Sequence, residues 1–154
     1  MPTDLRTRQL AKLIVDYSLR VKKGENVIIS GSTEAQEFIV ALYKEVILKG
    51  AHPILRVRIP GLNNFFYKYA NKEQIEKFPD HFDYMVKNAQ KYIGISTETN
   101  TRELTSCDPK KITEREKTVH PISDYVVNGK PKIYRVTVGF PCVALAQEAE
   151  MDLT

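Results

Sequence analysis

The segment Val27–Val57 constrains the fold of this chain more than any other. A short apolar run at 27–30 is followed by the turn Gly31–Thr33, an amphipathic helical pattern ended by Gly50, and a second run rich in β-branched residues at Ile54–Ile59. This is the order of a strand, a turn, a helix and a second strand. The two strands of such a unit are parallel, with a right-handed connection, in nearly all proteins. The chain is therefore predicted to belong to the α/β class.

The other elements follow from apolar spacing and from Gly and Pro signals. Asp4 is a predicted N-cap of a first helix that ends at Gly24. The spacing predicts a third strand over Lys91–Ser96 and a fourth over Lys132–Val138. We expect one domain over residues 1–154, a three-layer α/β/α domain with a mainly parallel sheet of about four or five strands. Further helices are expected at 33–49, 62–70, 72–78, near 82–86, at 110–127 and after Pro141.

Three local features make sharper predictions. Thr33 and Gln36 fit a capping box, which would open the helix after the turn. Arg56 and Arg58 alternate with apolar residues, which indicates a strand with one exposed face or a place near the sheet edge. Pro121 directly follows His120 and is expected to interrupt the helix there.

Composition narrows the class of protein. The chain has 154 residues, 42% of them apolar and 27% charged, as in a globular protein, and a net charge of +4. No apolar run approaches the roughly 20 residues of a membrane span, and no secretory signal begins at Met1. Cys107 and Cys142 lack metal-binding spacing and are read as reduced thiols of a cytoplasmic protein. Because Lys and Arg are scattered among Asp and Glu, we expect neither a nucleic-acid partner nor a membrane partner.

The turn Gly31, Ser32, Thr33 is the candidate anion site. Its backbone N–H groups precede a helix, directly after a strand, and open parallel sheets bind ligands beyond the carboxyl ends of their strands. Thr97 and Asn100 would lie near it. The turn has neither the GxxxxGK[ST] nor the GxGxxG pattern, so a purely structural role as a helix start is the competing interpretation.

No residue is predicted to be catalytic, to bind a cofactor through a known motif or to bind metal. The histidines His52, His81 and His120 stand outside HxH and HExxH patterns. A metal site built from His81 with Asp80 and Asp83 is kept as a minor alternative. Cys142, after Pro141 at a helix start, is interpreted as a small buried residue rather than a nucleophile.

The aromatic segment Phe65–Lys72 has two basic residues and helical spacing. We interpret it as a core-facing stripe with a basic outer face. Two alternatives stay open: a surface that packs on another domain or subunit, and base stacking with phosphate contacts in a nucleic-acid complex.

Taken together, these segments resemble the amino-terminal domain of the thermophilic metalloaminopeptidases, the aminopeptidase T / aminopeptidase S / PepS group. The likeness covers nearly the whole chain and is weakest over residues 62–90. It departs from the family at Cys142, where the family usually has Thr after Tyr-Pro. The order and spacing of five segments carry the resemblance: Leu10–Gly24, Glu25–Ser32, Gly50–Pro53, Asn100–Ile112 and Gly139–Pro141 with Ala144–Ala149.

The resemblance implies a parent enzyme more than twice as long, which removes N-terminal residues from peptides with two divalent metal ions, zinc or cobalt. It places the Glu, His, Tyr and Asp ligands in a carboxy-terminal domain, and none of them maps onto a residue of this chain. The chain alone is then expected to be inactive, with a second copy or the carboxy-terminal domain as its partner. The residues Met151–Thr154 are of the type that would lead into another helix.

Overall fold

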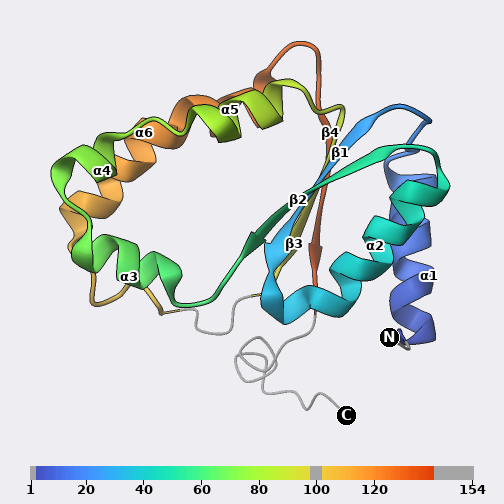
Figure 1. Cartoon of the computed structure of the whole chain (residues 1–154), viewed down its shortest axis with the longest axis horizontal. Coiled ribbons are helices and arrows are strands. Elements are labelled where there is room, and N and C mark those ends of the chain that lie inside the picture. The colour runs from blue at the N-terminus through green and yellow to red at the C-terminus, as the bar shows by residue number, and fades with distance from the viewer. Residues whose placement is uncertain (1–2, 98–101, 141–154) are drawn as a thin grey trace.

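The structure is a computed structural model, and it describes residues 3–97 and 102–140. Within these residues the strands form one fully parallel sheet in the order β2-β1-β3-β4, as predicted for an α/β chain (Figure 1). Helices cover both faces, which gives the expected three-layer α/β/α arrangement. The strands are β1 (Asn26–Ser32), β2 (His52–Arg58), β3 (Lys91–Ser96) and β4 (Tyr134–Gly139).

The sheet order explains the composition of its strands. Strand β1 lies between β2 and β3, and all of its residues except Asn26 are buried. A strand covered on both faces needs no polar alternation, which is why 27–29 reads Val-Ile-Ile. Strand β2 lies at an edge, as its arginines indicated, and Pro53 stands near its start, where an edge strand tolerates the missing N–H.

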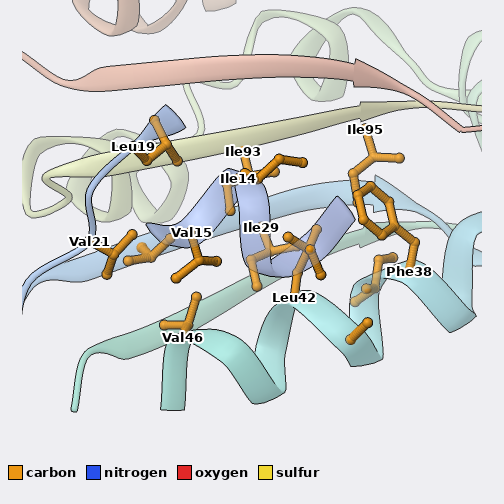
Figure 2. Close-up of a cluster of buried hydrophobic side chains, with 14 of the residues drawn as sticks. Ile14, Val15, Leu19, Val21, Ile29, Phe38, Leu42, Val46, Ile93 and Ile95 are labelled. Carbon is orange, nitrogen blue, oxygen red and sulfur yellow. The ribbon is translucent and has the colours of Figure 1, made fainter. Parts of the chain in front are cut away.

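One face of the sheet packs against α1 (Leu5–Leu13), the π-helical turn η1 (Ile14–Ser18) and α2 (Gln36–Leu48). Figure 2 shows this core, in which Phe38, Leu42 and Val46 of α2 point toward Ile29 and Ile93 of the sheet. All five side chains are fully buried. This core fixes the amino-terminal helices on the sheet.

The first helix begins as predicted and ends early. Asp4 is its N-cap, and the Asp4 carboxylate accepts the N–H of Arg6 at 2.7 Å. The predicted end at Gly24 is wrong, because the helical backbone stops at Ser18 and Arg20 takes a positive φ of 49°. The early stop lets Leu19 and Val21 turn into the core, where both are buried. Gly24 belongs instead to the turn before β1.

The opposite face of the sheet packs against the second half of the chain. Here α5 (Asp80–Lys87) and α6 (Pro109–Asn128) cover Ile28 of the central strand through Val86 and Ile122, all of them buried. In Figure 1, α6 extends away from the sheet with α4 beside its far part, and α3 lies next to α4; we call α3 and α4 the arm. The arm helices are α3 (Leu62–Tyr69) and α4 (Lys72–Glu76).

Two local predictions are corrected. Ser32, not Thr33, caps the turn after β1: the Ser32 hydroxyl accepts the Glu34 N–H at 3.2 Å, a 3₁₀ turn η2 (Thr33–Ala35) follows, and α2 has no side-chain cap. The helix α6 also runs through Pro121 without interruption. Pro121 is exposed, and the burial of Ile122 beside it holds the helix against the sheet despite one missing hydrogen bond.

Some predictions fall outside the described residues. These are the last helix, which was expected after Pro141, the thiol Cys142 and the loop residue Asn100. In the part of the chain that the structure describes, we find no helix with the length and apolar character of a membrane span.

Candidate functional site

A groove of about 890 Å³ lies between the sheet and the helices of the second layer. Its volume falls within the range of small-molecule sites, about 300–1,000 Å³. Strands β2, β3 and β4 form one side, and helices α3, α5 and α6 form the other. The side chains of the sheet that line it are Arg56, Tyr92, Arg135 and Thr137, and those of the helical layer include Leu62, Phe65, Phe66, Tyr67, His81, Phe82, Arg115, Val119, Val126 and Val127.

The strand register shows why the sheet is open here. Ile54, Ile28 and Tyr92 are aligned across three strands, and all belong to the apolar cluster under α5 and α6. Two residues further along the strands, the aligned residues are Arg56, Ser30, Gly94 and Thr137. Side chains two apart share a face of a sheet. The apolar core on this face therefore stops halfway along the strands, and small and cationic residues replace it.

Besides the groove, whose lining includes no residue of β1, the sheet has a topological switch point. The chain leaves β1 toward β2 on one side, and β3 continues to β4 on the other, so β1 and β3 meet at a topological switch point. Ligands of such sheets bind beyond the carboxyl ends of the strands at this point. Ser32 and Thr97, at the ends of these two strands, join them there with their hydroxyl oxygens 2.9 Å apart.

Two cations of α6 fasten the arm. The Lys111 ammonium donates to the carbonyls of Tyr67 and Ala70 at 3.2 and 3.0 Å, at the end of α3. The Arg115 guanidinium donates to the Ile75 carbonyl at 3.2 Å and to the Lys77 carbonyl, at the end of α4. Cations favour the carboxyl ends of helices, where carbonyls lack helical partners. Arg115 is therefore a structural residue, although it lines the groove.

Arg56 and Arg135 are in a different situation. The Arg56 guanidinium lies 4.1 Å from the ring centre of Phe82, and neither arginine forms a hydrogen bond or an ion pair with any described residue. No Asp or Glu is present among the described residues that line the groove. The groove thus has an uncompensated positive charge next to aromatic and aliphatic walls.

Helix α3 overturns the interpretation of residues 65–72 as a core stripe. It has no buried residue, and Phe65 and Tyr69 are each 62% exposed. Their rings contact each other, with centres 4.6 Å apart, rather than the core. The physical reason is position: the arm leads α3 away from the sheet, so its apolar face has no element of the described chain to cover it. The alternative, a surface that packs on another domain or subunit, stays a prediction.

One tyrosine of the groove has a perturbed acidity. Partial burial raises the pKa of the Tyr67 phenol above its ordinary value of 10.0, although the positive charge of Arg115 acts in the opposite direction. Tyr67 is therefore neutral at physiological pH and can donate a hydrogen bond from its O–H.

The candidate anion turn has clear structural roles. A Cβ added at Gly31 would lie 3.2 Å from the Ile95 Cβ and 3.4 Å from the Ile39 Cδ1, so Gly31 allows the strand to approach the core. Ser32 caps η2 and contacts Thr97, and Thr33 is the first residue of η2. Anion binding at Gly31, Ser32 and Thr33 stays a prediction.

The histidine and thiol candidates are dispersed. His52 and His120 are exposed, on β2 and α6, and His81 lines the groove. The Asp83 carboxylate binds the Lys87 ammonium at 2.9 Å, which raises the pKa of Lys87. No group of three or more His, Cys, Asp and Glu residues within residues 3–97 and 102–140 could hold a metal ion. The described residues therefore do not fit a two-metal centre.

Arg56, Arg135 and Thr137 line the groove and were not predicted as site residues from the sequence. One signal was present, the polar alternation on the second and fourth strands. No local sequence pattern predicts the helical side of the groove, because that side depends on the distance between the arm and the sheet.

The fold and groove define a parallel α/β domain with a ligand-sized groove between one face of its sheet and the helices on that face. The sequence matches the thermophilic metalloprotease family, M29, over residues 3–153, and the chain belongs to this family. A search of curated proteins found no match.

Solved structures support the fold. The chain superimposes on wild-type AmpT from Thermus thermophilus with a TM-score of 0.72 and 18% identity, covering 88% of this chain and 36% of that one. A crystal structure of CurK enoyl reductase gives a TM-score of 0.36 and 10% identity, covering 92% of this chain and 44% of that one. We infer nothing from this match. The chain thus spans about a third of the length of AmpT.

Proposed function

We propose that this chain is the amino-terminal, non-catalytic domain of a metal-dependent aminopeptidase that removes N-terminal residues from peptides. The observation that carries the proposal is a contrast. The chain matches a metalloprotease family over residues 3–153, yet its described residues contain no group of three metal-ligand side chains. Metal-assisted hydrolysis needs ions that polarise the carbonyl and activate water, and the ligands would lie in the part of the enzyme that this chain does not cover.

The proposal includes the setting of the parent enzyme. It is a cytoplasmic homodimer with a pair of zinc or cobalt ions, and this chain supplies the α/β layer beside its active site. The length of AmpT supports this arrangement, since the matched part of AmpT leaves room for a further domain. The exposed aromatic face of α3 supports a contact with such a domain or with a second copy.

A direct test uses the 154-residue chain itself. Purified chain is incubated with a leucyl substrate and Zn²⁺ or Co²⁺, after a cooperative urea transition has shown that it is folded. We expect no release of leucine. Metal-dependent release that stops on addition of a chelator would contradict the proposal.

The alternative function is a stand-alone binding module with an anion or small molecule at Gly31–Thr33. The structure favours it less, because the Glu34 N–H of this turn already donates to the Ser32 hydroxyl. Phosphates, nucleotides and peptides can be screened by thermal shift, since a ligand of the folded state raises Tm. This alternative would be supported by a ligand-induced rise in Tm that is lost in the Gly31→Ala variant. The same rise must be kept in a variant with a substituted groove residue.

A further inference from the structure

We propose that the groove is a binding site for a carboxylate on an apolar or aromatic body, with Arg56 as the residue that binds the carboxylate. The inference does not depend on the peptidase role, because it concerns binding by this chain without turnover. The C-terminal end of a peptide and a small free acid share this chemistry, and the experiment below distinguishes them.

The first argument is the state of Arg56. Arg56 is partly buried and its guanidinium lies over the Phe82 ring, 4.1 Å from the ring centre, while its N–H groups have no hydrogen-bond partner among the described residues. Stacking holds the planar fork in place and leaves its edge free. A fork held in this way matches a carboxylate, which accepts two parallel N–H bonds.

The second argument is charge. Arg135 lies on the other edge strand, three strand spacings or about 14 Å across the sheet. It also has no ion-pair partner in the described chain, and no described acidic residue lines the groove. The two arginines that line the groove therefore favour an anion over a cation or a neutral amide.

The third argument is the apolar wall of the groove. Leu62, Phe65 and Val127 line the groove and remain more than half exposed. Burying such surfaces against an apolar ligand is favourable, because it removes apolar area from water. Apolar walls with a few fixed polar groups are typical of small-molecule sites, in which the polar groups set the orientation.

The experiment is an NMR titration of the 154-residue chain with four probes. N-acetyl-leucyl-phenylalanine carries the carboxylate on a peptide, and its C-terminal amide is the uncharged control. 4-Phenylbutyrate carries the carboxylate without a peptide, and phenyl phosphate offers another oxyanion. We expect both carboxylates to shift the resonances of groove residues and the amide to bind at least about tenfold more weakly. The carboxylate that binds more tightly shows whether the natural ligand is the C-terminal end of a peptide or a small free acid.

The variants locate the site. Arg56→Gln should weaken carboxylate binding by at least about tenfold, and Arg56→Lys should not restore it fully, because a lysine lacks the fork. Arg58→Gln is the matched control, since Arg58 lies two residues further on the same strand and does not line the groove. It should change the affinity by less than about twofold, because an exposed charge is screened. Urea unfolding of each variant checks the fold. Arg135→Gln, which removes no hydrogen bond or ion pair within the described residues, is the second groove variant and should lower the affinity.

Three results would overturn the inference. The first is equal binding of the acid and the amide, which would show an apolar groove without anion recognition. The second is an equal effect of Arg56→Gln and Arg58→Gln, which would show attraction by net charge alone. The third is tighter binding of phenyl phosphate than of either carboxylate.

Discussion

At the residue scale, side chains of similar type have different roles because of their neighbours. Arg115 and Lys111 hold helix ends through backbone carbonyls, whereas Arg56 is stacked on a ring with its edge free. Gly31 and Gly94 differ in the same way, since Gly31 contacts the core and Gly94 lies at the level of the groove residues. The surroundings of each residue, not its type, separate structure from function here.

The two strand glycines give a stability prediction. Gly31→Ala should lower the free energy of unfolding by about 1–3 kcal/mol, because the new methyl would press on Ile95 and Ile39. Gly94→Ala is the matched control: its nearest neighbour would be the Thr137 hydroxyl oxygen at 3.7 Å, an ordinary contact. We expect its stability to be unchanged or higher by about 0.5 kcal/mol. Urea unfolding measures both, and equal stability of the two variants would contradict the role given to Gly31.

At the element scale, predictions held where the burial of an element is set by its own sequence. Strand β1 is buried as predicted, and so are Phe38, Ile39, Leu42 and Val46 of the predicted stripe on α2, while Tyr43 and Ile47 of that stripe are exposed. Helix α3 has an equally clear apolar stripe and no buried residue. Periodicity predicts that a face needs a partner, but it does not say whether the partner lies in the same domain.

The arm gives the second stability prediction. Phe65→Ser should change the free energy of unfolding by no more than about 0.5 kcal/mol, because Phe65 is 62% exposed. Phe38→Ala is the contrasting variant, since Phe38 is fully buried and stacks on Phe140 with ring centres 5.1 Å apart. It should lower stability by about 3–5 kcal/mol. A loss of similar size in both variants would restore the core-stripe interpretation of residues 65–72.

The groove could be predicted only in part. The two arginines are visible as polar alternation on the edge strands. The free edge of Arg56 could not be predicted, because it depends on the packing of Phe82 from α5, which is far along the chain. The structural role of Arg115 was hidden for the same reason, since its acceptors are carbonyls at the end of another helix.

At the scale of the whole molecule, the two faces of the sheet have different roles. One face carries a continuous apolar core with α1 and α2, which stabilises the domain. The other is apolar only under α5 and α6, and its remaining half opens into the cationic groove. In the proposed parent enzyme, this second face would lie toward the peptide and the catalytic domain. The metal ligands would belong to that catalytic domain.

The most direct test of this account is the metal content of the folded chain. Purified chain is dialysed against Zn²⁺ or Co²⁺, then against metal-free buffer, and the retained metal is measured by atomic emission. Urea unfolding before and after shows that the fold is intact. The account predicts no stoichiometric retention and no rise in stability with metal, because a ligand of the folded state alone would stabilise it. Retention of two ions per folded chain, removed by a chelator together with metal-dependent leucine release, would contradict it.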